Sequence, residues 1–407
     1  MAPTSDLQII APRRREHRDA LVDFWSKIFG FAGDSTHYFN GREFCRDGYL
    51  DGSHYDWDAS RIGLIDGQLV THYGVWGYDM RVGRAAARAG GIGTVSTHPD
   101  FRERGYLVRT ANASIAAMRE RGYDLSVLFG IDDFYHRLGY VRAFSYRQHY
   151  LRVDDLPKEK PGAAFRRFKL VRREDTDKLY NRAFAGRTGT AIRPTFTKGG
   201  DIRGDGYGWR DGRGRLAGYV YVSIDDAQRR LKCYEAVGDV TQVLRVLGVL
   251  GRKHASKELE ILNQPRDTPL MREVERGRCE VVTRLNPDGG PMARTLNLPG
   301  LLEKMTVELR TRLVSSVLAK RSATLLIDDG TQEAGLRITP RRVSVVQPTQ
   351  SSHAIKTRGH AVQLVLGTDA PERLIAAAQM KTTGDAARWV AALFPAQDPM
   401  LLTFDHF

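Results

Sequence analysis

The sequence predicts an α/β protein of about three folded units, and three observations lead to this prediction. The chain has 407 residues, about two to four times the roughly 100–200 residues of a typical domain. Amphipathic helical stretches alternate with short segments rich in β-branched and aromatic residues. A charged, Pro-flanked stretch at residues 157–161 and a turn-forming stretch at 286–291 divide the chain. We therefore expect units at residues 1–150, 151–288 and 289–407.

The first unit is expected to begin with a helix and a meander of strands. Residues 14–29 place Leu21, Trp25 and Ile28 on one face of an amphipathic helix. The segments after it are rich in Gly, Val, Ile and Tyr and are separated by turn residues, which is typical of strands joined by hairpins. These expected strands cover residues 61–65, 67–78 and 89–97.

A helix, a buried strand and a short helix complete the first unit. Residues 105–121 carry an apolar stripe at helical spacing, and residues 124–129 are typical of a buried strand. Asp132 and Asp133 suit the first turn of another helix, which Gly139 ends. The predicted order is therefore strand, helix, strand, helix.

A similar alternation recurs in the second unit, with a strand at 215–224, a helix at 240–254 and a strand at 258–262. This recurrence indicates an internal duplication. The third unit is expected to contain helices and strands and to end with a helix over residues 371–393.

Composition excludes several classes of protein. Hydrophobic residues make up 42% and charged residues 27% of the chain, an ordinary balance that excludes collagenous and wholly disordered chains. No run of about 18 uncharged apolar residues occurs, so no membrane span is expected. The start of the chain has no secretory pattern, and Cys45, Cys233 and Cys279 show neither disulfide nor zinc spacing. We expect a cytoplasmic protein without a bound metal.

The net charge of +14 is unevenly distributed. Residues 1–150 carry 19 basic and 18 acidic residues, so the excess belongs to the rest of the chain. Such a charge is compatible with nucleic acid, an anionic membrane surface or a polyanionic cofactor. The arginine pairs, such as residues 166–167 and 341–342, are scattered and do not form a larger cluster of basic residues interleaved with aromatic residues. We therefore expect no nucleic-acid partner.

The most informative segment covers residues 95–111, V-S-T-H-P-D-F-R-E-R-G-Y-L-V-R-T-A, which runs from a strand through a basic loop into a helix. The first N–H groups of a helix have no partner within it and carry partial positive charge. A pyrophosphate can therefore bind at this loop, where arginines add charge and glycine permits close approach. The loop residues are Arg102, Glu103, Arg104, Gly105 and Tyr106. Taken alone, the same loop is equally well a turn whose arginines coat the surface.

A second segment completes the pattern. Residues 125–140, L-S-V-L-F-G-I-D-D-F-Y-H-R-L-G-Y, run from a buried strand into a short helix with Tyr135 four residues before Gly139. Together, the basic glycine loop and the F-Y-x-x-x-G-Y pattern resemble the acetyl-CoA site of the GNAT acetyltransferases. The resemblance implies that the strands at 89–97 and 124–129 are parallel neighbours that separate to admit the pantetheine arm.

The resemblance extends over the whole chain. The family's phosphate motif, R/Q-x-x-G-x-G/A, is matched at Arg102, Arg104 and Gly105, but Leu107 replaces a small residue. A large residue there is seen in the branch that resembles the mycobacterial Eis (enhanced intracellular survival) acetyltransferases. Further likeness lies in W-x-D-G-x-G-R-L-A-G-Y-V-Y-V at 209–222, P-R-D-T-P-L at 265–270, G-P-M-A-R at 290–294, L-F-P at 393–395 and the terminal phenylalanine.

The Eis-like branch implies tandem GNAT folds, the second degenerate, followed by a sterol-carrier-protein-like α+β domain. It also implies one acetyl-CoA site per chain and a homo-oligomer, namely a hexamer. The second unit has no R-x-x-G loop at the corresponding place, in agreement with a single site.

The resemblance also implies catalytic roles. Tyr135 matches the family's general acid, which would protonate the departing thiolate. In the Eis-like branch the C-terminal carboxylate, here that of Phe407, reaches the active site and takes a proton from the amine. Backbone N–H groups around Val95, Ser96 and Thr97 would bind CoA and polarise the thioester carbonyl.

Other residues offer alternatives. Transfer through Cys45 competes, although its acidic neighbours would raise the pKa of the thiol. His98 and His136 flank the expected site as possible proton relays, but a lone histidine is more often a surface or hydrogen-bonded residue. Without their context, Tyr135 is a packing residue and Phe407 a frayed end.

The amine acceptor is the least determined part of the reaction. Residues 42–66 contain six acids and three arginines, and Asp47, Asp51 and Trp57 are the candidates that would hold a cationic amine. A solvated acidic loop explains the same pattern. Aminoglycosides, polyamines, lysine side chains and small amines stay open. So do two other classes of protein: a non-catalytic CoA or lipid binder that uses the sterol-carrier-like domain, and a basic scaffold for DNA or membranes.

Overall fold

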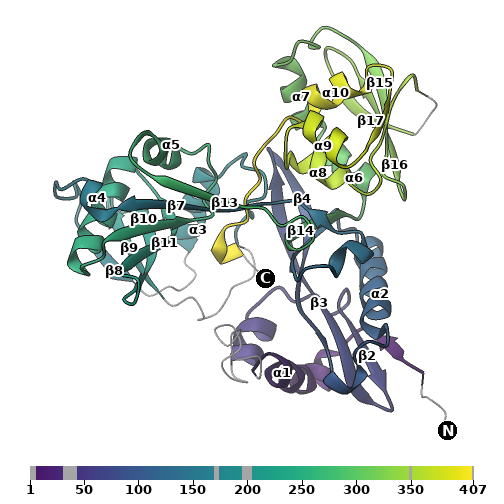
Figure 1. Ribbon diagram of the computed structural model, residues 1–407, viewed down its shortest axis with the longest axis horizontal. Coiled ribbons are helices and arrows are strands. Elements are labelled where there is room, and N and C mark those ends of the chain that lie inside the picture. The colour runs from purple at the N-terminus through teal and green to yellow at the C-terminus, as the bar shows by residue number, and fades with distance from the viewer. Residues whose placement is uncertain (1–5, 31–43, 169–173, 195–203, 348–350, 406–407) are drawn as a thin grey trace.

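The structure is a computed structural model that describes residues 6–30, 44–168, 174–194, 204–347 and 351–405. Three β-sheets of seven, seven and five strands form the centres of three units, and helices pack on each of them (Figure 1). The predicted mixed α/β class is confirmed. Among the described residues, no helix has the length and apolar character that a membrane span requires.

The first sheet has the order β1-β2-β3-β4-β5-β14-β6, in which β4 and β5 are parallel neighbours. Two helices cover its opposite faces, because alternate residues of β3 join two separate cores. Trp76 shares a core with Trp25 of α1, whereas Val75 shares one with Ile115 of α2. The elements are β1 (Gln8–Ile10), α1 (Arg14–Gly30), the π-helix η1 (Phe44–Asp51), β2 (Arg61–Ile65), β3 (Gln68–Val82), β4 (Ala85–Thr97), α2 (Tyr106–Glu120), β5 (Leu125–Gly130), β6 (Val141–Arg142) and β14 (Gly290–Thr295).

The second sheet has the order β13-β7-β12-β11-β10-β9-β8, with β11 parallel to β12. Its core is formed by α4 and by strands from the whole unit. The elements are β7 (Tyr146–Arg152), β8 (Phe165–Phe168), α3 (Glu174–Ala183), β9 (Asp205–Arg210), β10 (Leu216–Asp225), β11 (Arg230–Val237), α4 (Val240–Lys253), β12 (Glu258–Leu262), α5 (Pro269–Arg276) and β13 (Glu280–Arg284).

The sheets do not divide at the predicted boundaries. β7 crosses residue 150 and pairs with β12 and β13 of the second sheet. β14 lies beyond residue 288 but pairs with β5 and β6 of the first sheet. Local patterns mark a segment as a strand but do not say which sheet it joins, since that depends on partners far along the chain.

The third unit has the sheet order β17-β16-β15-β18-β19, with β15 parallel to β18. The helix predicted over residues 371–393 is wrong. β19 interrupts it by pairing with β18, and Gly384, with a φ of +51°, turns the chain into α10. The elements are α6 (Leu298–Lys304), α7 (Thr306–Val314), β15 (Ala323–Asp328), β16 (Glu333–Ile338), β17 (Val343–Val346), β18 (His353–Lys356), α8 (Ala361–Leu366), α9 (Pro371–Ala377), β19 (Lys381–Thr383) and α10 (Ala386–Leu393).

After α10 the chain returns from the third unit to the junction of the other two (Figure 1). Asp398 of this tail is paired with Arg147 of β7, and Met400 N–H donates to the Thr188 carbonyl at 3.3 Å. The last described turn, the 3₁₀-helix η5 (Thr403–Asp405), packs on β11. The tail therefore packs on the first two sheets rather than on the unit that precedes it.

Candidate active site

The parallel strands β4 and β5 separate at one end. They pair up to Ile92 and Leu128. Beyond these residues β4 continues to Thr97 along β3, whereas β5 continues to Gly130 along β14. The expected separation of the two strands is confirmed, and the chain provides the gap that an extended pantetheine arm needs.

A β-bulge lies in β4 just beyond the point of separation. Thr94 and Val95 together stand opposite Tyr73 of β3, and Thr94 has a φ of +45°. A bulge bends its strand and leaves one residue outside the hydrogen-bond ladder. Ser96 and Thr97 pair with β3 again, and the Ser96 hydroxyl donates to the Thr94 carbonyl at 3.0 Å. The bulge, rather than these hydroxyls, is therefore the part of β4 that can offer free backbone N–H groups.

The bulge rests on His72, a residue that the sequence analysis missed. Its Nδ1 lies 2.9 Å from the Thr94 carbonyl and 3.2 Å from Trp25 Nε1, and its Nε2 lies 2.9 Å from the Tyr55 hydroxyl. Complete burial lowers the pKa of His72 to about 4. The imidazole is therefore neutral at physiological pH and acts as a hydrogen-bonded support. A lone histidine in a strand carries no signal of this role, because its partners lie 17 to 47 residues away.

The basic loop between β4 and α2 is exposed. Glu103 and Gly105 have positive φ values of 62° and 72°, and no side chain caps the first N–H groups of α2. Arg102 and Arg104 are exposed, and Arg104 donates to the Asp100 carbonyl at 2.9 Å. With Tyr106 as the first residue of α2, the loop combines free N–H donors with two guanidinium groups, the combination that binds a pyrophosphate.

Tyr135 begins the 3₁₀-helix η3 (Tyr135–Leu138) and is 7% exposed. Its ring lies 5.0 Å from that of Phe134 and 6.1 Å from that of Tyr140, and Gly130 at the end of β5 leaves room for it. Burial raises the pKa of Tyr135, so the phenol keeps its proton at neutral pH. Its hydroxyl has no hydrogen-bond partner among the described residues.

Tyr140 differs from Tyr135, because its hydroxyl is bonded twice, to Tyr73 at 3.0 Å and to Ser126 at 2.7 Å. These bonds fit the structural role expected for Tyr140. Tyr135 is the tyrosine whose hydroxyl is left to interact with a bound molecule.

The three predicted acceptor residues are not equivalent. Asp51 accepts hydrogen bonds from Arg18 and, at 2.8 Å, from Arg14 of α1, which lower the pKa of its carboxyl and neutralise its charge. Asp47 lies in η1, but its side chain is outside the described part of the chain. Trp57 packs against Tyr55 with ring centroids 4.8 Å apart.

Trp57 lines a cleft of about 530 Å³ between the edge of β3 and residues of the second unit. Asp56 and Asp58 in this cleft are paired with Arg121, at 3.3 and 3.1 Å. Asp79 also lines the cleft and is exposed. The cleft thus offers one carboxylate without an ion pair in the described part, beside aromatic side chains.

The C-terminal carboxylate of Phe407 lies outside the described residues. The last described residue, Asp405, is 2% exposed. Burial and, to a smaller extent, the Asp405 carboxylate raise the pKa of Tyr78 on β3. The Asp405 carboxylate therefore lies within electrostatic range of β3.

The remaining candidates have no catalytic setting. Cys45 is fully buried, His136 is exposed, and His98 lies 3.7 Å from Asp100 and packs its ring against Phe101. Among the described residues, no group of three His, Cys, Asp or Glu side chains is arranged to hold a metal ion.

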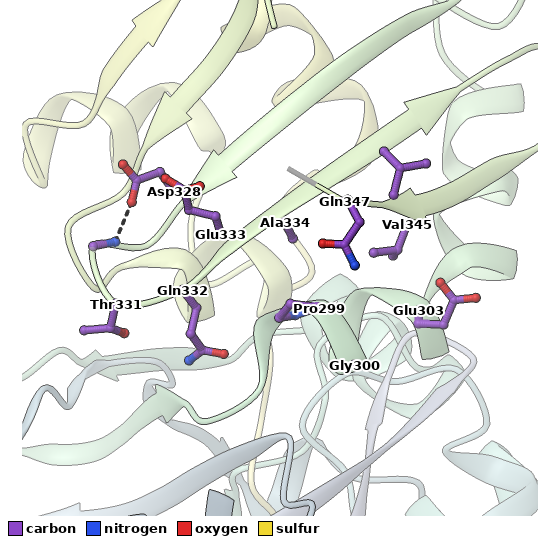
Figure 2. A pocket seen from close by; sticks show the side chains of 12 residues that line it. Pro299, Gly300, Glu303, Asp328, Thr331, Gln332, Glu333, Ala334, Val345 and Gln347 are labelled. Carbon is purple, nitrogen blue, oxygen red and sulfur yellow. Dashed lines mark hydrogen bonds between the residues drawn. The ribbon is translucent and has the colours of Figure 1, made fainter. Parts of the chain in front are cut away.

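A second hollow lies in the third unit, between α6 and the β15–β16 turn (Figure 2). It has a volume of about 940 Å³, and its lining mixes carboxylates and amides with a few small apolar residues. The polar side chains around it belong to Glu303, Asp328, Thr331, Gln332, Glu333 and Gln347. Such a lining is a poor match for a lipid chain, which needs an apolar wall.

Comparisons with known proteins agree with this geometry. Residues 12–143 match a family model described as an acetyltransferase (GNAT) domain. A GCN5-related N-acetyltransferase from Anabaena variabilis has a TM-score of 0.77 at 14% identity, covering 98% of this chain and 99% of that one. A probable N-acyltransferase from Enterococcus faecalis has a TM-score of 0.74 at 17% identity, covering 98% and 100%. Eis1 from Mycobacterium abscessus has a TM-score of 0.68 at 15% identity, covering 96% and 97%. No curated protein matches the sequence.

The solved structures show that the fold of nearly the whole chain is shared, and the family match covers the unit that holds the separated strands. The first unit is a GNAT acetyltransferase domain, and the protein is an N-acetyltransferase. Acyl transfer from an acyl-CoA to an amine is the chemistry of this domain, and acetyl-CoA is the donor that its fold uses. The predicted enzyme class is confirmed.

Proposed function

We propose that the protein transfers the acetyl group of acetyl-CoA directly to a cationic amine at a single site in the first unit. The observation that carries the proposal is the joint placement of three features: the separated ends of β4 and β5, the uncapped basic loop before α2, and the buried, protonated Tyr135. The pyrophosphate binds at residues 102–106, and the pantetheine arm lies between the strands.

Each step of the transfer has a group to perform it. The terminal carboxylate of Phe407, directly or through water, takes a proton from the ammonium, which at a pKa of about 10 is mostly protonated at neutral pH. The amine nitrogen bonds to the carbonyl carbon of the thioester, whose oxygen is polarised by backbone N–H groups at the bulge, around Val95. The carbon–sulfur bond breaks, and Tyr135 protonates the thiolate. The second proton of the nitrogen returns to Tyr135 through solvent.

We propose an aminoglycoside, a polyamine or a lysine side chain as the acceptor. Of the predicted residues, Trp57 supports this proposal best, because it lines the cleft that also contains Asp79. Asp51 holds the start of α1 instead, since two arginines already neutralise it.

We also propose that the protein is an Eis-like enzyme with a degenerate second GNAT unit and a sterol-carrier-like third unit. The fold that it shares with Eis1 over 96% of the chain is compatible with this assignment. We propose the cytoplasm as its location and a hexamer as its assembly. Analytical ultracentrifugation at several concentrations measures the assembly, and a monomer throughout would contradict it.

A panel of amines tests the function. Purified protein is mixed with acetyl-CoA and, in separate reactions, an aminoglycoside, spermidine, a lysine peptide and a small monoamine, and the release of free thiol is measured. We expect thiol release above the amine-free background with at least one polycation and little with the monoamine. Acetyl-CoA binding without thiol release for any amine would contradict direct transfer to these acceptors.

A further inference from the structure

A buried ion cluster lies where the second unit meets the C-terminal tail. Arg193 donates two hydrogen bonds to Glu235 of β11, from Nη1 to Oε1 at 2.9 Å and from Nη2 to Oε2 at 2.7 Å. It donates two more to Asp405 of the tail, from Nε to Oδ1 at 2.9 Å and from Nη2 to Oδ2 at 3.2 Å. The exposed fractions of the three side chains are 9%, 0% and 2%. One planar guanidinium thus donates four hydrogen bonds to two buried carboxylates, whereas a lysine ammonium has only three donors.

Two tyrosines complete the cluster. Tyr180 of α3 donates to Asp405 Oδ2 at 2.5 Å, and its ring centroid lies 3.5 Å from the guanidinium carbon of Arg193. Tyr219 of β10 donates to Glu235 Oε1 at 2.6 Å. Buried charges are tolerated when each is paired and hydrogen-bonded. Both carboxylates are hydrogen-bonded, but one guanidinium neutralises only one negative charge, and burial raises the pKa of Glu235.

The segment before Arg193 joins the cluster to the catalytic sheet. Residues 189–192 run along the free edge of β3, where Ile192 N–H donates to the Asp79 carbonyl and Arg81 N–H to the Thr190 carbonyl, both at 2.8 Å. The buried Arg81 side chain also donates to the Ala191 carbonyl. Because β3 is the neighbour of β4, this segment is fixed to the sheet that carries the bulge.

We infer that Arg193 is a positioning residue that fixes the end of the chain to the catalytic unit through Asp405. The inference rests on the proposed role of the Phe407 carboxylate. Phe407 follows Asp405 by two residues, and two residues of chain span at most about 7 Å from one Cα to the other. Holding Asp405 restricts the volume that the base can occupy, which favours a reactive arrangement with the amine. Phe404 also holds the tail, since its ring centroid lies 5.0 Å from that of Tyr221. This contact carries no charge, so a variant that removes only the charge of Asp405 leaves it in place.

Asp405→Asn tests the inference, because it keeps the shape of the side chain and removes its charge. Asp398→Asn is the matched control: it makes the same change seven residues earlier in the tail, where Arg147 is the partner. We expect Asp405→Asn to lower kcat about tenfold with an unchanged KM for acetyl-CoA, and the residual activity to rise with pH. The control is expected to keep the wild-type kcat and pH profile, and thermal melting of both variants shows that they fold.

A second measurement does not depend on activity. Carboxypeptidase digestion followed by mass spectrometry reports how firmly the end of the tail is held. We expect Asp405 to be removed much more slowly from the control than from a variant whose cluster is broken by Arg193→Lys. Equal rates would overturn the inference. If Asp405→Asn does not fold, Tyr180→Phe removes one hydrogen bond from the same carboxylate and should lower kcat less.

A C-terminally extended protein separates failure of the inference from failure of the proposed function. If extension lowers kcat but Asp405→Asn does not, the positioning role is overturned and the proposed base stands. If extension has no effect, the proposed base is wrong and the inference falls with it. The extended Asp405→Asn protein should lose no more activity than the extended protein alone, and additive losses would mean that Asp405 acts on something other than the terminus.

Discussion

The first and second units repeat one strand plan and use it differently. In each, a long strand pairs in parallel with a shorter one and leads into a helix: β4 with β5 before α2, and β11 with β12 before α4. The long strand continues past the last parallel pair in both units, from Ile92 in β4 and from Cys233 in β11. In the second unit, side chains of the protein already bind the end of β11. Gln264 donates to the Tyr234 carbonyl at 2.9 Å, and Glu235 binds Arg193.

The N-termini of α2 and α4 also differ between the two units. α2 begins after Gly105 without a side-chain cap, whereas the Asp239 carboxylate caps α4 by accepting from Gln242 N–H at 2.9 Å. A carboxylate in this place occupies a donor that a phosphate would use and repels the phosphate charge. Two units with the same strand plan therefore differ at the helix N-terminus that would bind a phosphate, so the fold alone does not make a CoA site. This difference supports one site per chain, with the second unit serving to hold the tail.

The largest effect is expected from extending the chain beyond Phe407. A short C-terminal tag converts the terminal carboxylate into an amide and displaces it, so kcat should fall by about 10²- to 10⁴-fold, and the remaining activity should rise with pH as more amine becomes neutral. Initial rates between pH 6 and 9 check this. The same tag at the N-terminus is the control, and an extended protein with wild-type rates would show that the second unit holds a tail without a catalytic role.

Tyr135→Phe removes only a hydroxyl. We expect kcat to fall about 10²-fold with little change in the KM for acetyl-CoA, because the thiolate loses its proton donor. Tyr140→Phe is the matched control, since the same atom is lost from a tyrosine that is bonded to Tyr73 and Ser126. The control should lose about 1 kcal/mol of stability and keep its kcat. Equal kcat values for the two variants would make Tyr135 a packing residue.

Acid should destabilise the first unit through His72. Its pKa of about 4 lies below the unfolded value of about 6.5, so the unfolded chain binds more protons between these values and stability falls as the pH drops. The loss from pH 7.5 to 5 is expected to be about 2 kcal/mol. Urea unfolding of the wild type and of His72→Gln measures it, and the variant should lose this part of the pH dependence.

His149 in the second unit is the comparison for His72. Burial also lowers the pKa of His149, but Glu275, 3.1 Å from its Nε2, acts in the opposite direction. His149→Gln should therefore change the acid sensitivity less than His72→Gln does. The reverse order would mean that the neutral support under the bulge is not the acid-sensitive group.

The smallest effect is expected at the phosphate loop. Arg102→Ala with Arg104→Ala should raise the KM for acetyl-CoA severalfold, because exposed charge-assisted contacts contribute about 1 kcal/mol or less each. Arg341→Ala with Arg342→Ala removes the same charge from an exposed site in the third unit and should not change this KM. In the second unit, Asp239→Ala should cost about 1 kcal/mol of stability as a lost cap and leave the KM unchanged. If both double variants raised the KM for acetyl-CoA by the same factor, the effect would come from the net charge of the protein and not from a phosphate site at the loop.

Much of the first unit was predictable because its signals are local. The spacing of apolar residues placed α1 within one residue of its observed end, and β2 and β12 have the predicted bounds. The basic loop before α2 and the short helix at Tyr135 were also found, since each is specified by fewer than ten neighbouring residues. The acidic stretch did not reveal that Asp51 is paired with Arg14 and Arg18, because these partners lie more than 30 residues earlier.

Distance along the chain separates the features that the sequence alone specifies from those that only the tertiary structure decides. Helix stripes, turns and a glycine loop depend on backbone preferences within a few residues, so the amino-acid order alone specifies them. Which sheet β7 and β14 join, how His72 is buried under the bulge, and why Arg193 meets Asp405 depend on packing. Arg193 and Asp405 are 212 residues apart, and they meet only because residues 189–192 and the tail converge on the same two sheets. Such contacts exist only in the folded chain, where the burial of apolar surface brings distant segments together and makes an unpaired charge costly.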